Sequence, residues 1–206
     1  MRKFDRSSLQ IGYAAHELGH ALGFWHTHVR HDRDEYITVN STNIDGDDDI
    51  RRQFDKQSNK SNDNYGLPYD YGSVMHYGST AGSINRTKST MIPKDELYAQ
   101  TLGSLIISFY DIFMMNIHYN CTGFCRKDEH DKCKNRGFAH PRNCSKCICP
   151  SGYGGDSCNE RPTVCGAELN VTSNWTQLVT ANSSDLEAGT EDGYKRCVYW
   201  LNVSVF

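Results

Sequence analysis

The feature that most constrains this chain is a pair of histidines four residues apart, followed by a glycine and a third histidine. His16 and His20 have the i and i+4 spacing that places two imidazoles on one face of a helix. Gly23 can adopt the positive φ that ends a helix, so the chain can turn and bring His26 back to the same point. Three neutral histidines leave one coordination position of a zinc ion open, as catalytic zinc sites require. The pattern therefore predicts one bound Zn²⁺.

Glu17 follows the first of these histidines. Its carboxylate is expected to reach a water at the metal without being a ligand itself. The alternative is that the histidines merely pack or lie in solvent on an amphipathic helix. A chance HExxH is expected in roughly a few per cent of chains of this composition, and requiring Gly23 and His26 as well lowers the chance to about one in several thousand. The spacing therefore favours the metal site.

Two stretches of the sequence resemble the astacin family of zinc metalloproteases, which belongs to the metzincins. The first is FWHTHVRHDRDEY at 24–36, and the second is SVMHY at 73–77, which is similar to the family's Met-turn. The resemblance covers about residues 9–121. It implies an α+β fold in which this chain supplies the lower part of a metzincin catalytic domain. That part consists of the zinc-binding helix, the Met-turn and a C-terminal helix that opens at Ser108 and ends at Cys121.

The resemblance also implies roles for single residues. It implies three zinc ligands, which are His16, His20 and His26. Glu17 would be the general base, and Tyr77 would be a fifth ligand that swings away to hydrogen-bond the oxyanion. Met75 would place an apolar thioether beneath the three imidazoles.

The sequence departs from the family pattern in two respects. Thr27 replaces a glutamate that, in the family, receives the amino terminus released by removal of a propeptide, so that contact is not expected here. The family's N-terminal subdomain and propeptide have no counterpart in the sequence. The opening residues, Met1–Arg6, are charged and lead to no apolar stretch, so no secretory signal is predicted. We therefore expect an N-terminally truncated fragment.

The cysteines and glycosylation motifs favour an extracellular protein. All nine cysteines come after position 120, and six lie between 125 and 158. Such crowding is typical of small extracellular modules, which need disulfides because their cores are small. Nine Asn-x-Ser/Thr acceptors, against roughly two expected by chance, also favour a secreted glycoprotein. The acceptors are Asn40, Asn59, Asn85, Asn120, Asn143, Asn170, Asn174, Asn182 and Asn202.

The spacing of these six cysteines resembles that of an EGF module. Spacing alone leaves fifteen connectivities open. The resemblance implies that the first pairs with the third, the second with the fourth and the fifth with the sixth. These pairs are Cys125–Cys144, Cys133–Cys147 and Cys149–Cys158. A zinc knuckle is the alternative, and the extracellular context argues against it.

The last part of the chain resembles the start of a CUB β-sandwich, in which Cys165 pairs with Cys197, and this leaves Cys121 as the odd thiol. The resemblances together predict three parts of the chain. These are a catalytic domain at 1–121, an EGF-like module at 122–160 and a partial CUB domain at 164–206.

The predicted function is a zinc endopeptidase that hydrolyses peptide bonds of extracellular proteins, with protein partners bound through the EGF and CUB parts. The alternative is an inactive fragment that only binds proteins through those parts. The net charge of −3, without a basic patch, argues against a nucleic-acid partner. No stretch reaches the roughly eighteen apolar residues that a membrane span needs.

Overall fold

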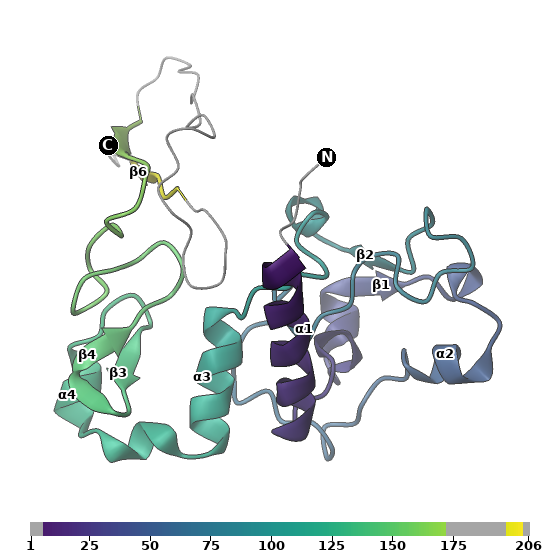
Figure 1. The fold of residues 1–206 in the computed structure, drawn as a ribbon, viewed down its shortest axis with the longest axis horizontal. Coiled ribbons are helices and arrows are strands. Elements are labelled where there is room, and N and C mark those ends of the chain that lie inside the picture. The colour runs from purple at the N-terminus through teal and green to yellow at the C-terminus, as the bar shows by residue number, and fades with distance from the viewer. Residues whose placement is uncertain (1–5, 172–196, 204–206) are drawn as a thin grey trace. The chain divides into compact units, whose positions relative to one another are not determined.

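Figure 1 shows the fold in a computed structural model, which describes residues 6–171 and 197–203, with side chains from residue 11 onward. The chain divides into two compact units, residues 1–115 and residues 116–206. Each unit is described by itself. The boundary between them falls inside helix α3 (Phe109–His118). The division into a catalytic domain, an EGF-like module and a partial CUB domain stays a prediction.

Helix α1 (Arg6–Ala21) carries both histidines of the HExxH pattern. It ends where the sequence predicts, because Gly23 has a φ of 95°. The Gly23 N–H donates to the His20 carbonyl (3.0 Å), and the next N–H along the chain donates to the carbonyl of Gly19 (2.9 Å). This pair of bonds is a Schellman motif, in which glycine tolerates the left-handed conformation. The chain therefore reverses direction just before His26.

The core of the first unit lies around a two-stranded antiparallel sheet. Strand β1 (Ile37–Val39) pairs with β2 (Met91–Pro93), and Thr38 lies opposite Ile92. The buried residues of this core are Ile37, Ile44, Phe54, Tyr69, Tyr71 and Met91. Helix α2 (Asp48–Arg52) begins after Asp47, whose carboxylate caps it. The single-turn 3₁₀ helices of this unit are η1 (Thr27–Val29), η2 (Arg33–Glu35), η3 (Ser41–Asn43) and η4 (Glu96–Tyr98).

Helix α3 begins with a reciprocal cap. The Ser108 hydroxyl accepts from the Asp111 N–H (3.0 Å), and the Asp111 carboxylate accepts from the Ser108 N–H (2.9 Å). Such a capping box satisfies two N–H groups that a helix leaves unpaired at its start. The predicted end of this helix was wrong: α3 stops at His118 and not at Cys121. The reason is local, because Asn120 has a left-handed φ of 53° and the chain continues as a short 3₁₀ helix.

The second unit is held together mainly by disulfides. It contains η5 (Cys121–Phe124), α4 (Lys127–Asp131) and an antiparallel hairpin of β3 (Phe138–His140) with β4 (Asn143–Ile148). Its buried core is small, formed by two cysteines and Ala139 with further cysteines beside them. A core of this size needs covalent cross-links. They are Cys125–Cys144, Cys133–Cys147 and Cys149–Cys158, the pairs that the EGF resemblance implies.

The end of the described chain forms one more pair of strands. Strand β5 (Glu168–Asn170) pairs in parallel with β6 (Trp200–Asn202), and a disulfide joins Cys165 to Cys197. Among the described cysteines only Cys121 is free, as expected for the odd thiol. The acceptors Asn174 and Asn182 lie outside the described residues. None of the described helices combines the length and the hydropathy that crossing a bilayer requires.

Candidate metal centre

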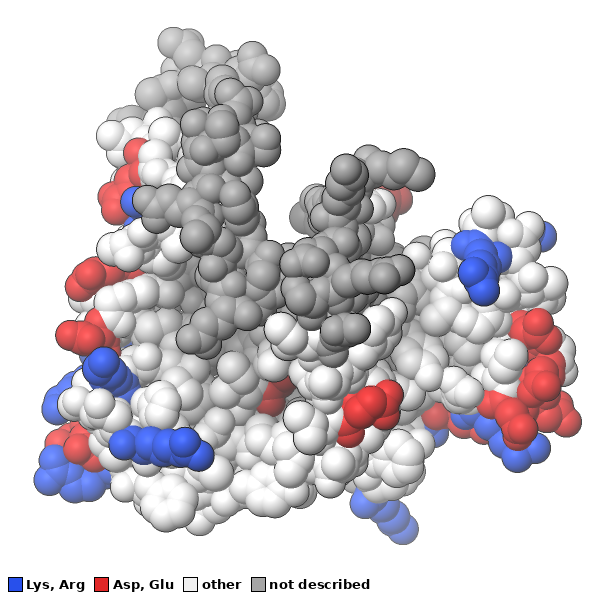
Figure 2. All heavy atoms as spheres, in the orientation of Figure 1, with Lys and Arg blue, Asp and Glu red and all other residues white. Residues whose placement is uncertain are grey.

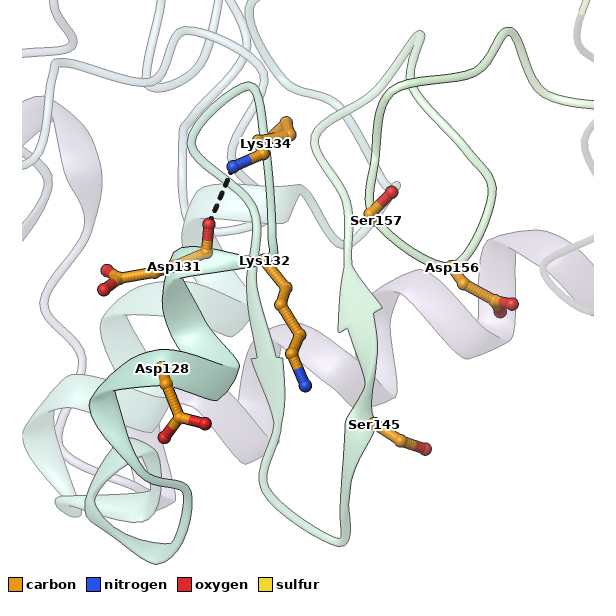
Figure 3. Close-up of a pocket in the computed structure, with 7 residues that line it drawn as sticks. All are labelled: Asp128, Asp131, Lys132, Lys134, Ser145, Asp156 and Ser157. Carbon is orange, nitrogen blue, oxygen red and sulfur yellow. Dashed lines mark hydrogen bonds between the residues drawn. The ribbon is translucent and has the colours of Figure 1, made fainter.

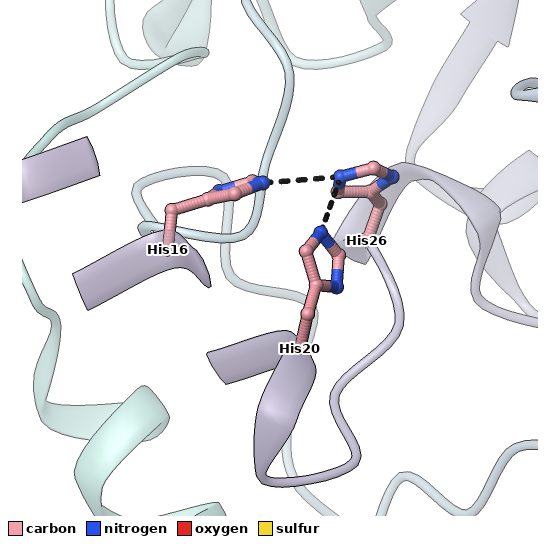
Figure 4. A group of neighbouring side chains, drawn as sticks. All are labelled: His16, His20 and His26. Carbon is pink, nitrogen blue, oxygen red and sulfur yellow. Dashed lines mark hydrogen bonds between the residues drawn. The ribbon is translucent and has the colours of Figure 1, made fainter. Parts of the chain in front are cut away.

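The three predicted metal ligands converge on one point, as Figure 4 shows. His16 and His20 project from α1, and His26 comes from the segment after the turn at Gly23. The Nε2 atom of His26 lies 3.1 Å from Nε2 of His16 and 3.0 Å from Nε2 of His20. Helix periodicity aligns the first two rings, and the Schellman turn returns the third.

Backbone carbonyls fix the tautomers of two of these rings. His16 Nδ1 lies 2.8 Å from the carbonyl oxygen of Val74, and His20 Nδ1 lies 2.9 Å from that of Phe24. A carbonyl oxygen only accepts, so each Nδ1 carries the proton and each neutral ring presents an Nε2 lone pair. Both lone pairs face Nε2 of His26, which can donate a proton to only one of them. The cluster therefore has more acceptors than donors at its centre and suits a cation.

This donor set fits zinc. Two nitrogens bound at 2.0–2.1 Å in tetrahedral geometry are separated by about 3.3 Å, close to the observed Nε2 separations. Burial, and then the charges that His20 and His16 would carry, lower the pKa of His26 from 6.5 to about 4. His26 is therefore neutral at pH 7, which is the form that binds a metal.

Met75 lies against the helix that bears the cluster, at Gly19. Its side chain is 2% exposed, and a Cβ added to Gly19 would lie 2.5 Å from its sulfur. Only glycine lets the thioether approach the helix this closely. The Met75 carbonyl also accepts from the N–H of Thr27 at 3.0 Å, which ties the third-histidine segment to the same turn. The sequence singled out Met75 by resemblance, but it gave no signal for the role of Gly19.

Tyr77 lies beside the cluster, but its hydroxyl points elsewhere. The ring centroid lies 4.3 Å from that of His26, and the ring stacks on His28 at 4.4 Å. The hydroxyl donates to the side-chain oxygen of Gln53 at 2.7 Å. Burial, and then the negative charge of Glu17, raise the pKa of Tyr77, so the phenol stays protonated and remains a donor. Sequence reasoning missed Gln53, and the role of Tyr77 as a ligand stays a prediction.

Glu17 is exposed on the helix between His16 and His20 and is not a member of the cluster. Its carboxylate is close enough to Tyr77 to influence the phenol. The role of Glu17 as the general base stays a prediction.

Two arginines fix the segment that follows His26. Arg30 is buried, and its guanidinium forms two bonds to Asp32 (2.9 and 2.7 Å) and one to the carbonyl of Pro68 (2.9 Å). Arg33 donates to the carbonyl of His28 at 3.0 Å. A planar guanidinium group that donates several hydrogen bonds at once gives a rigid connection between chain segments. The charged run after the third histidine is thus anchored in the first unit through its two arginines, while Asp34 and Glu35 are exposed.

Two further histidines lie behind the site. His28 is 0% exposed, and its Nε2 donates to the carbonyl of Gln53 at 3.0 Å. His76 is 3% exposed and bonds to the hydroxyl of Tyr69 at 2.8 Å. Burial is the largest cause that lowers the pKa of His28 to about 3 and the pKa of His76 to about 4. Both rings are neutral structural elements at pH 7.

These two histidines predict that the metal-free protein loses stability in mild acid. In the unfolded chain both bind a proton near the ordinary pKa of 6.5, whereas in the folded chain they do so only at about 4 and about 3. The free energy of unfolding is therefore highest above 6.5 and falls as the pH drops below it. The slope is about 1.4 kcal/mol per pH unit for each histidine. Urea unfolding at neutral and mildly acidic pH measures this. A His76→Gln variant should show a shallower dependence, and an unchanged slope would contradict the assignment.

A pocket lies in the second unit and is drawn in Figure 3. Its lining mixes acidic, basic and hydroxyl side chains, and Lys134 Nζ donates to the backbone carbonyl of Asp131 at 2.9 Å. The lining contains no histidine and no thiol, so it has no counterpart of the three-histidine cluster. On the described part of the face in Figure 2, positive and negative side chains are interspersed among neutral ones.

Comparison with known proteins agrees with this geometry. Residues 3–120 match the family described as Astacin, which is a family of peptidases. The zinc metalloproteinase nas-31 of Caenorhabditis elegans is 50% identical over 192 residues, which are 93% of this chain and 31% of that protein. The zinc metalloproteinase nas-25 of the same organism is 43% identical over 166 residues, which are 80% of this chain and 41% of that protein.

A solved structure gives a weaker likeness. It is High choriolytic enzyme 1, a hatching enzyme zinc-protease from Oryzias latipes, with 37% identity and a TM-score of 0.48 over 53% of this chain and 52% of that one. The matched part of the chain spans about a third of the length of one nematode relative and about two fifths of the other. The family match, in contrast, covers more than half of the chain and includes all three convergent histidines. On this evidence the chain belongs to the astacin family.

Proposed function

We propose that this chain carries the catalytic centre of a zinc metalloendopeptidase that hydrolyses peptide bonds of extracellular proteins. The observation that carries the proposal is the convergence of three Nε2 atoms, two of them fixed as lone-pair donors by backbone carbonyls. His16, His20 and His26 would hold the zinc. When bound, zinc polarises a carbonyl and lowers the pKa of a water in the site.

The chain's own residues would move the protons. Glu17 takes a proton from the attacking water and passes it to the leaving amine. Tyr77, protonated and already oriented by Gln53, would exchange that partner for the oxyanion and donate its hydrogen bond there. In this proposal the Tyr77 hydroxyl changes its hydrogen-bond partner from Gln53 to the oxyanion, while the Tyr77 ring lies against His26.

The test is hydrolysis of casein by the purified protein. We expect cleavage that a chelator abolishes and that added zinc restores. A zinc-loaded protein that cleaves nothing would instead favour the alternative, a non-catalytic chain that only binds other proteins. The intact motif supports the enzyme, because Glu17 and all three histidines are present.

We also propose that 122–160 is an EGF-like module and 164–206 a partial CUB domain, both of which would bind protein partners. The pairing of the six cysteines as first with third, second with fourth and fifth with sixth supports the first assignment. The bond between Cys165 and Cys197 supports the second. Four disulfides in one chain also support secretion, because such bonds persist in oxidising compartments.

Secretion predicts glycosylation at Asn85. Asn85 and Thr87 are both exposed, and the Asn85 side-chain oxygen accepts from the Thr87 N–H (3.1 Å) and hydroxyl (2.9 Å). The amide and the hydroxyl of this acceptor motif are therefore adjacent and open to solvent. Glycopeptide mass spectrometry of the secreted protein is expected to find a glycan there. Asn85→Gln and Thr87→Ala should remove it, and Thr87→Ser should keep it. An unmodified Asn85 in the secreted protein would contradict this prediction.

A further inference from the structure

Asp111, at the start of α3, accepts hydrogen bonds from three separate groups. Its Oδ1 accepts from the Ser73 hydroxyl (2.6 Å), and its Oδ2 accepts from the N–H groups of Val74 (3.0 Å) and Ser108 (2.9 Å). A helix cap requires only the bond to Ser108. The other two bonds tie the carboxylate to the turn that contains Met75.

Val74 connects this carboxylate to the metal centre. Its N–H donates to Asp111, and its carbonyl accepts from Nδ1 of His16 at 2.8 Å. That bond keeps the proton on Nδ1 and leaves the Nε2 lone pair facing the cluster. His20 receives the same support from the carbonyl of Phe24, at the end of its own helix. The orientation of His16 thus depends on a distant part of the chain, whereas that of His20 is set locally.

We propose that Asp111 is a positioning residue for His16. By holding the Val74 peptide group in place, it fixes the tautomer and the direction of the His16 ring and so increases the affinity of the chain for zinc. The inference rests on the proposed zinc site. Groups that orient metal ligands in this way typically change metal affinity by about 10- to 100-fold when they are replaced.

The rival explanation is that Asp111 only caps α3, and two variants separate the possibilities. Asp111→Asn keeps the size of the side chain but replaces one carboxylate oxygen by an NH₂ group that cannot accept. Because Ser73 donates to one oxygen, and Val74 and Ser108 donate to the other, the variant loses either the bond from Ser73 or the bonds from Val74 and Ser108. Ser108→Ala removes the hydroxyl that caps the Asp111 N–H (3.0 Å) and leaves the bonds to Ser73 and Val74 in place. Ser108→Ala is therefore the control for loss of the cap, and it also removes the bond from the Ser108 hydroxyl to the Asp70 carboxylate.

Zinc affinity of the full chain is measured by competition with a chelator. Asp111→Asn is expected to weaken zinc binding by about 10- to 100-fold, and Ser108→Ala is expected to bind zinc like the wild type, although both lose stability in urea. Side-chain NMR of the metal-free protein gives a second readout. It should show His16 protonated at Nδ1 in the wild type and in Ser108→Ala, and as a mixture of tautomers in Asp111→Asn.

Zinc binding by Asp111→Asn as tight as that of the wild type would overturn the inference and leave Asp111 as a cap. If Asp111→Asn does not fold, Ser73→Ala removes one of the two connecting bonds, together with the bond that the Ser73 hydroxyl accepts from the Met75 N–H, and keeps the cap. It should then weaken zinc binding, and unchanged binding would equally overturn the inference. A wild-type chain that binds no zinc would contradict the proposed function itself, so the two failures are distinguishable.

Discussion

Replacing Glu17 by glutamine is expected to slow peptide hydrolysis by about 10²- to 10⁴-fold while zinc stays bound. Glutamine has nearly the same size as glutamate, but it cannot take the proton of the attacking water. The three converging nitrogens come from histidines only, and Glu17 is not among them, so the metal should be unaffected. Initial rates on casein and the zinc content of the purified variant measure the two quantities separately.

The control for this experiment is Glu96→Gln, which changes another exposed glutamate of the first unit, in η4. Its rate should match that of the wild type. Full activity of Glu17→Gln would refute the role of general base. Loss of zinc from Glu17→Gln would instead indicate that the carboxylate helps to hold the metal.

Zinc is expected to stabilise the folded chain strongly, and the effect should require His26. Free zinc at about a thousand times its dissociation constant raises the free energy of unfolding by about 4 kcal/mol if only the folded state binds it. His26 is the only one of the three proposed ligands outside α1, so a folded chain is needed to bring all three nitrogens together. His26→Asn should lose most of this zinc-dependent increase in the free energy of unfolding, which urea unfolding with and without zinc measures.

His31→Asn is the matched control, because His31 lies in the same segment but contacts Asn64 and not the cluster (3.0 Å between His31 Nε2 and Asn64 Nδ2). That variant can be less stable overall, yet its gain on adding zinc should equal that of the wild type. Equal gains in His26→Asn and the wild type would exclude His26 as a ligand. The comparison needs no catalytic assay, so it tests the metal site apart from the reaction.

The convergence of the histidines was predictable because it depends on rules that act over a few residues. An i, i+4 spacing places His16 and His20 on one helix face, and Gly23 ends the helix because it adopts a φ that other residues disfavour. The pairing of the six cysteines between 125 and 158 was predicted on a different basis. Spacing left it open, and only the resemblance to EGF modules selected the pairs that the structure contains.

The support around the histidines could not be predicted, because it comes from residues far away along the chain. The carbonyl that orients His16 belongs to Val74, which lies 58 residues further along the chain. The N–H of Val74 is held by Asp111, which lies another 37 residues further on. Neither contact leaves a periodic or compositional trace in the sequence. The same is true of the bond from Tyr77 to Gln53 and of the close approach of Met75 to Gly19.

The sequence by itself thus determined the kind of site: which side chains can bind a metal and where the helix ends. These properties follow from residue type and local backbone geometry. The tertiary structure alone decided how the ligands are oriented, which tautomers they adopt and how deeply His28 and His76 are buried. Orientation and burial depend on which distant segments meet, and that is set by the packing of the whole unit.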